Sequence, residues 1–118
     1  MIQAASHTEA AALVADALGE VGVTVHPPPI PTTPVAAPAV LIQTPEAVEA
    51  KGLTPCRWAF QVSVMVVGAD TTGRGLLALV DSVAAALAAR GLTTTTSPQL
   101  YQAPNTPAPL PAVLIRGE

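Results

Sequence analysis

The clearest pattern of hydrophobic and polar positions lies at residues 56–68, where apolar side chains recur at every second position. Side chains of a strand alternate between its two faces, so this period predicts one long β-strand. Its expected core face comprises Cys56, Trp58, Phe60, Val62, Val64 and Val66. The opposite face mixes polar and apolar residues, which predicts a half-buried surface or contact with another chain. That face comprises Arg57, Ala59, Gln61, Ser63, Met65 and Val67.

Two other stretches repeat their apolar positions with the period of an α-helix. The first follows Ser6 and Glu9, whose S-x-x-E spacing is that of a capping box. Its apolar stripe comprises Leu13, Val14, Ala17 and Leu18. The second helix is expected at about residues 74–90, with Asp70 or Thr72 as N-cap and Gly91 at its end. Its stripe comprises Leu76, Val80, Val83, Ala84 and Leu87.

The 13 prolines fall in two belts, at residues 27–55 and 98–111, and they separate the remaining elements. Proline lacks a backbone N–H, so regular structure is expected mainly outside these belts. Shorter apolar runs predict strands at residues 21–26, 39–44, 92–97 and 112–116, while residues 45–55 are expected to form a loop. The predicted order is α-β-β-β-α-β-β. We therefore expect one α+β domain over residues 1–118, a two-layer sandwich in which two helices cover one face of a mixed sheet of about four to five strands.

Composition changes this picture in one respect, because only 11% of the 118 residues are charged. Soluble domains commonly contain about 25% charged residues. We therefore expect other copies of the chain to cover part of its surface. The apolar content of 50% argues against disorder, the net charge of -3 against a basic nucleic-acid-binding module, and the single cysteine against a disulfide framework.

The N-terminal stretch has no Lys or Arg before its apolar residues, so no signal peptide is expected there. No apolar run approaches the ~18–20 residues of a membrane span, so a protein without membrane association, assembled in the cytoplasm, is expected.

No catalytic, cofactor-binding or metal-binding constellation emerges from the chemically reactive residues. The only histidines, His7 and His26, are far apart in sequence, and the carboxylates are scattered. A nucleophilic Cys56 partnered by His26 is an alternative to a buried structural cysteine. Residues 68–75 (GADTTGRG) join a predicted strand to a helix but lack the nucleotide-binding glycine motifs. The sequence therefore predicts that the protein is not an enzyme and has no cofactor.

The order of segments resembles the tail terminator proteins of long-tailed bacteriophages. The resemblance rests on a short N-terminal helix followed by VGVTVH, a proline-rich connection to PAVLIQ, and the long strand CRWAFQVSVMVV. An Asp/Thr turn then opens a helix containing LVDSVAAAL, and the chain closes on a second PAVLI segment. The similarity covers nearly the whole chain.

This resemblance implies a structural virion protein at the head-proximal end of the tail. It implies a ring, usually hexameric, that stops polymerisation of the major tail-tube protein and meets the head-completion protein. Genomic DNA would pass through the lumen without sequence-specific binding, which a net negative subunit permits. The loops at residues 27–38, 44–55 and 98–111 are expected to contact other subunits or the tube. Candidate interface residues are Arg57, Gln61, Met65, Glu46, Glu49, Lys51 and Asp81.

Two alternatives remain open at this point. The chain could form a head-completion or other ring protein of the same virion neck, which would have a similar size and oligomeric state. It could instead be a regulatory domain that binds a small ligand, in which case a defined pocket is expected between helices and sheet.

Overall fold

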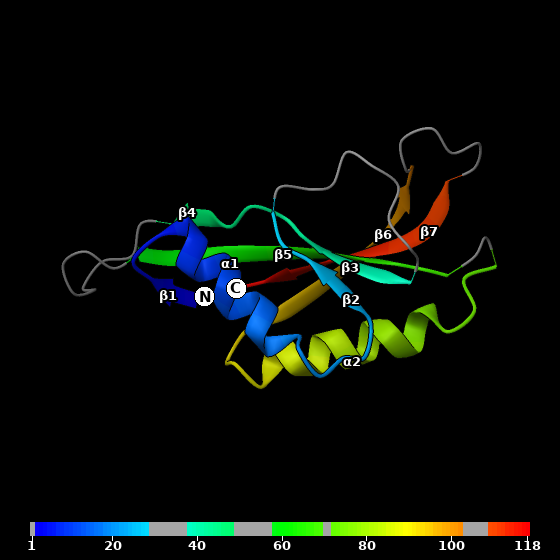
Figure 1. The fold of residues 1–118 in the computed structure, drawn as a ribbon, viewed down its shortest axis with the longest axis horizontal. Coiled ribbons are helices and arrows are strands. Elements are labelled where there is room, and N and C mark those ends of the chain that lie inside the picture. The colour runs from blue at the N-terminus through cyan, green and yellow to red at the C-terminus, as the bar shows by residue number, and fades with distance from the viewer. Residues whose placement is uncertain (1, 29–37, 49–57, 70–71, 103–108) are drawn as a thin grey trace.

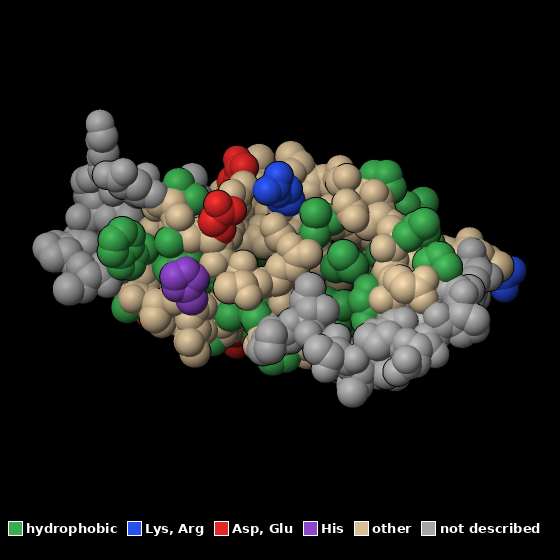
Figure 2. Space-filling view, turned by 90° about the horizontal axis from the view of Figure 1, so that it is seen from above, with side chains coloured by type: hydrophobic (Ala, Val, Ile, Leu, Met, Phe, Trp, Pro, Cys, Tyr) green, Lys and Arg blue, Asp and Glu red, His purple; other side chains and the backbone are tan. Residues whose placement is uncertain are grey.

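The long strand β5 forms the centre of the sheet in the computed structural model (Figure 1). The structure describes residues 2–28, 38–48, 58–69, 72–102 and 109–118. Its strands are β1 (Ile2–Ala4), β2 (Thr24–His26), β3 (Ala39–Ile42), β4 (Glu46–Val48), β5 (Trp58–Val67), β6 (Thr94–Tyr101) and β7 (Leu110–Gly117). The fold is elongated, with extents of 47 × 26 × 22 Å, as its outline in Figure 2 also shows.

Both edges of β5 are occupied along nearly its whole length. Its second half pairs with β3 on one side and β7 on the other, and its first four residues pair with β4 at residues 59–61 and with β1 at residues 58–60. The full order is β2-β3-β5-β7-β6, with β4 and β1 extending the rows of β3 and β7. Only β2 and β3 run parallel, so the sheet is mixed. The termini of the chain consequently meet beside β5, where β7 ends and β1 begins (Figure 1).

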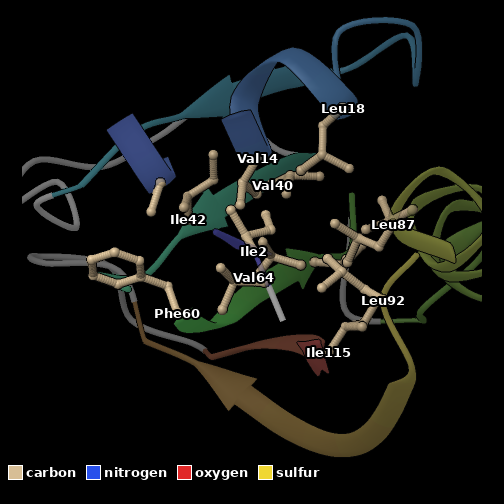
Figure 3. Close-up of a cluster of buried hydrophobic side chains, with 14 of the residues drawn as sticks. Ile2, Val14, Leu18, Val40, Ile42, Phe60, Val64, Leu87, Leu92 and Ile115 are labelled. Carbon is tan, nitrogen blue, oxygen red and sulfur yellow. The ribbon is translucent and has the colours of Figure 1, made fainter. Parts of the chain in front are cut away.

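Two helices, α1 (His7–Ala17) and α2 (Leu76–Ala88), pack on one face of this sheet. The alternate residues Phe60, Val62, Val64 and Val66 of β5 are at most 1% exposed and form the floor of the core. Val14 and Leu18 cover them from the first helical segment, and Leu87 and Leu92 from the second (Figure 3). Full burial of such a side chain contributes about 1.5–3 kcal/mol. The predicted α+β class and the two helical stripes are therefore confirmed.

The start of α1 confirms the predicted capping box of Ser6 and Glu9, except that the Glu9 carboxylate has a different partner. The Ser6 hydroxyl oxygen accepts a hydrogen bond from the backbone N–H of Glu9 at 3.1 Å. The Glu9 carboxylate accepts one in return at 2.7 Å, but from Ala5 rather than from Ser6 itself. Two backbone donors at the helix start are thus satisfied by a box extended by one residue.

The start of α2 differs from the prediction, because its N-cap is Gly75 and no side chain caps it. Gly75 has φ +78°, a left-handed conformation that favours glycine. The predicted cap Thr72 instead accepts a hydrogen bond from the backbone of Arg74 within the preceding turn, at 3.3 Å; Asp70 lies outside the described residues. At the other end, Gly91 has φ +82° and ends the helix as predicted.

The predicted number and order of strands were wrong in detail, since the described residues contain seven strands. The two extra ones are β1, before the first helix, and β4, which lies in the segment predicted as a loop. Each has three residues and pairs only with the start of β5. Segments this short have no readable period of their own, and tertiary pairing with an existing strand determines their conformation.

Two proline positions also lie inside strands, contrary to the predicted boundary at residue 98. β6 continues through Pro98 to Tyr101, and β7 begins one residue before Pro111. β6 is an edge strand, where a missing N–H on the outer side costs no ladder hydrogen bond. The second proline belt therefore does not mark a loop along its whole length, because both β6 and β7 extend into it.

The packing predicts a large difference between two leucines of the same helix. Leu87 is fully buried, whereas Leu77 is 73% exposed. Leu87→Ala should lower the free energy of unfolding by about 2–5 kcal/mol, because it leaves a cavity in the core. Leu77→Ala should change it by only about 0.5 kcal/mol. Urea unfolding of the two variants at a concentration where the chain is monomeric tests this; equal losses would show that α2 packs differently.

Candidate interaction surfaces

The face of the sheet opposite the helices contains three of the predicted interface residues. Gln61, Ser63 and Met65 alternate with the core valines of β5, so they point away from the helical layer. Glu46 of β4 lies directly across from Gln61 in the antiparallel register. Cross-strand partners share a face, so the structure brings Glu46, Gln61 and Met65 onto one surface, which we call the open face.

One end of the open face is polar. The side-chain amide of Gln61 donates a 2.6 Å hydrogen bond to the Glu118 carboxylate, which ties the last residue of the chain to β5. Ser63, the next residue on this face, lies across from Arg116 of β7, which in turn lies across from Thr95 of β6. These groups form a strip of mixed charge across the sheet.

The other half of the open face is apolar. Met65 lies between Leu41 of β3 and Leu114 of β7 in the register. A second hydrophobic cluster, separate from the main core, gathers here, and its buried members are Leu41, Val67, Tyr101 and Ala112. Met65 is half-buried against that cluster. The open face therefore combines a polar strip with an apolar patch, as its mixed sequence pattern predicted.

Of the four remaining predicted interface residues, the structure describes only Asp81, which is not on this surface. Asp81 is exposed on α2, in the opposite layer from Met65. Arg57, Glu49 and Lys51 lie outside the described residues, so the structure does not place them. The sequence analysis missed Glu118 and Arg116, and the only signal that could have indicated them was the pairing of the last strand with β5.

A proline at the outer edge of β6 limits the pairing of this edge with strands of other chains. Thr93 and Glu118 exchange two backbone hydrogen bonds of 2.9 Å, so the odd-numbered residues of β6 direct their backbone groups toward β7. The even-numbered residues, including Pro98, therefore direct theirs outward. Proline has no N–H, so the outer row of donors is interrupted in its middle.

We expect Pro98→Thr to create a continuous row of donors and to promote edge-to-edge association. Light scattering should then reveal large species that the parent chain does not form. Gln99→Thr is the matched control, because the N–H of residue 99 already points toward β7. Association by both variants, or by neither, would contradict this role of Pro98.

Among the residues that the structure describes, three large apolar side chains are exposed, and they lie at the two ends of the fold. Trp58, predicted as a core residue, is 53% exposed, so that prediction was wrong. It lies at the beginning of β5, beyond the part of the strand that the two helices cover. Leu77 and Leu100 are 73% and 69% exposed and lie at the other end, at the start of α2 and near the end of β6.

Trp58 borders a hollow of about 350 Å³ lined by Ala5, Ser6, His7, Ala47, Trp58 and Phe60. The His7 ring stands edge-on to the Phe60 ring, with centroids 4.9 Å apart and planes at 75°. This geometry is favourable for aromatic pairs and fixes one wall of the hollow. We call this hollow, with the six lining residues just given, the Trp58 hollow. Figure 2 shows hydrophobic side chains toward both ends of the face it draws.

A second cleft, of about 530 Å³, lies between the last turns of the two helices. The Arg90 guanidinium donates a 2.9 Å hydrogen bond to the Asp16 carboxylate across it, joining α2 to α1. Both side chains are well exposed, so this ion pair contributes little, of the order of 0–1 kcal/mol. Most of the lining is polar, charged or alanine side chains, and it includes Glu20, Ser82, Ala86 and Ala89.

Among the described residues, no group of three or more His, Cys, Asp or Glu side chains could hold a metal ion. Cys56, the alternative nucleophile, lies outside the described residues. Neither α1 nor α2 is long and apolar enough to cross a membrane.

Comparison with known proteins gives no assignment of the chain to a family. No protein-family model matches the sequence. A search of curated proteins likewise finds no significant match. Any function must therefore be argued from the surfaces described above.

Proposed function

We propose that the protein is a structural subunit of a phage virion, a tail terminator that forms a ring at the head-proximal end of the tail tube. In this role the ring ends polymerisation of the tube protein and presents a surface to the head-completion proteins. DNA passes through its lumen, and the low net charge of -3 on each subunit favours passage over retention.

The observation that carries the proposal is the open face. Helices cover only one side of the sheet, while the other side carries the polar strip at Gln61 beside the apolar patch, where Met65 and Leu114 are half-buried next to the buried members of the second hydrophobic cluster. Protein–protein interfaces commonly combine polar and apolar side chains on one surface. A ring subunit needs such a surface toward its neighbour or toward the tube.

The scarcity of charge supports the same role. With 11% charged residues, the subunit has fewer solvating groups than an isolated domain of this size commonly has. Contacts with neighbouring copies would remove apolar surface from water without requiring further charge. The order of segments that resembles tail terminators gives the proposal its specific form.

A head-completion or other neck-ring protein is the second candidate, since the same surfaces would serve it. The position of the ring relative to the end of the tube separates the two roles. The ligand-binding alternative has less support, because half of the side chains that line the cleft of about 530 Å³ around Asp16 and Arg90 are polar or charged. Binding pockets are predominantly apolar.

Tube assembly tests the proposed function directly. Purified protein added to polymerising tail-tube protein should bind one end of each tube and stop its growth there. Electron microscopy should then show tubes of limited length with extra density at one end. Unchanged tube growth in the presence of excess protein would contradict the role.

The open face predicts that Met65→Glu weakens assembly more than folding. The new carboxylate would have to be desolvated in an interface, whereas in the free subunit it could reach water from its half-buried position. Light scattering should show the loss of the ring, while circular dichroism shows a folded chain. Met65→Leu, which keeps an apolar side chain of similar volume, should retain the ring.

A second variant guards against misfolding of Met65→Glu. Gln61→Glu places a carboxylate across from Glu46 and beside Glu118. It should also reduce ring mass, because an interface on this face would have to bury three neighbouring carboxylates, and burial of unpaired charge is costly. Rings of unchanged mass in both variants would exclude the open face as an interface.

A further inference from the structure

The exposed large apolar residues that the structure describes lie at opposite ends of the helical side of the fold. Trp58 has the same parity in β5 as the core residue Phe60, so it lies on the helical side. Leu100 of β6 lies across from Pro111, which neighbours Ala112, the partner of Val67 at the far end of β5. The length of β5 therefore separates them, about 30 Å at ~3.3 Å per residue.

The two ends differ in shape. At one end Trp58 borders the hollow of about 350 Å³, whose walls are the rings of His7 and Phe60 and the small side chains of Ala5 and Ala47. At the other end Leu77 and Leu100 project with more than two thirds of their surface in water. A hollow with aromatic walls and a pair of projecting leucines are complementary in chemistry.

The two ends also differ in charge among the described residues, with a carboxylate near the hollow and a guanidinium near the leucines. Glu9 follows His7, which lines the hollow, by two positions. Arg74 is exposed three positions before Leu77. Opposite charges would therefore meet if the two ends came into contact.

We propose that the Trp58 hollow of one copy receives the Leu77–Leu100 end of the next copy. This inference rests on the proposed ring and names its subunit contact. The contact is heterologous, because two different patches of the same chain meet, and repetition of such a contact closes into a ring when the rotation permits. It covers Trp58, Leu77 and Leu100, the three large apolar side chains that are exposed in the described part of the chain, whereas a symmetric contact between two hollows would leave both leucines in water.

Paired variants of the full chain test this arrangement. Trp58→Ser removes the hollow and leaves the leucine end intact. The double variant Leu77→Ser and Leu100→Ser removes the leucine end and leaves the hollow intact. Ala85→Glu is the control, because Ala85 is exposed on α2 but belongs to neither end.

In native mass spectrometry each end variant should be monomeric, while the parent chain and the control retain the ring. A 1:1 mixture of the two end variants should give a dimer containing one copy of each, because a single intact contact remains. Assembly of the leucine variant alone together with loss of assembly in Trp58→Ser would indicate a symmetric contact at Trp58 and overturn the proposal. Unchanged rings in both variants would also overturn it.

Trp58 provides an independent readout, since it is the only tryptophan in the chain. Its fluorescence should shift to shorter wavelength as the parent chain assembles with rising concentration, and should not shift in the leucine variant. Absence of the shift in an assembled parent chain would overturn the contact. If the Trp58→Ser variant still forms rings that cap tubes, this contact is excluded and the proposed function stands. If the parent chain forms rings that fail to cap tubes, the proposed function is excluded and the contact stands.

Discussion

The fold depends on the burial of one side of β5. Phe60, Val62, Val64 and Val66 alternate along this strand and are removed from water almost completely. Their burial requires both helices to lie on the same face, and it holds β5 in the centre, where four other strands pair with it. A shift of one residue in its register would expose every one of these side chains, so the register is strongly specified.

The same constraint decides which surfaces are available to partners. Because the valines take the helical side, Gln61, Ser63 and Met65 must occupy the opposite side of the sheet. Because the two helices cover only the middle and far part of β5, its first residue, Trp58, extends beyond them and is half exposed. The open face and the Trp58 hollow are therefore consequences of how the core is built.

The sequence predicted those parts of the fold that have a period of their own. The alternation along β5 and the stripe from Leu76 to Leu87 were long enough to be read directly, and the structure confirms both. It did not predict β1 or β4, because three residues cannot establish a period and their pairing partner is distant in sequence. Exposure of Trp58 was missed for a related reason: a strand pattern identifies a face but not how far the opposing layer reaches along it.

The residues proposed to form the interface were predictable only in part. Gln61 and Met65 followed from the mixed face of β5, whereas their neighbour Glu118 is brought to Gln61 by the pairing of the chain's last strand.

The central claim is that this subunit assembles into a closed ring, and electron microscopy of the purified protein tests it most directly. Uniform particles with a central hole are expected, whereas isolated subunits at every concentration would contradict a ring.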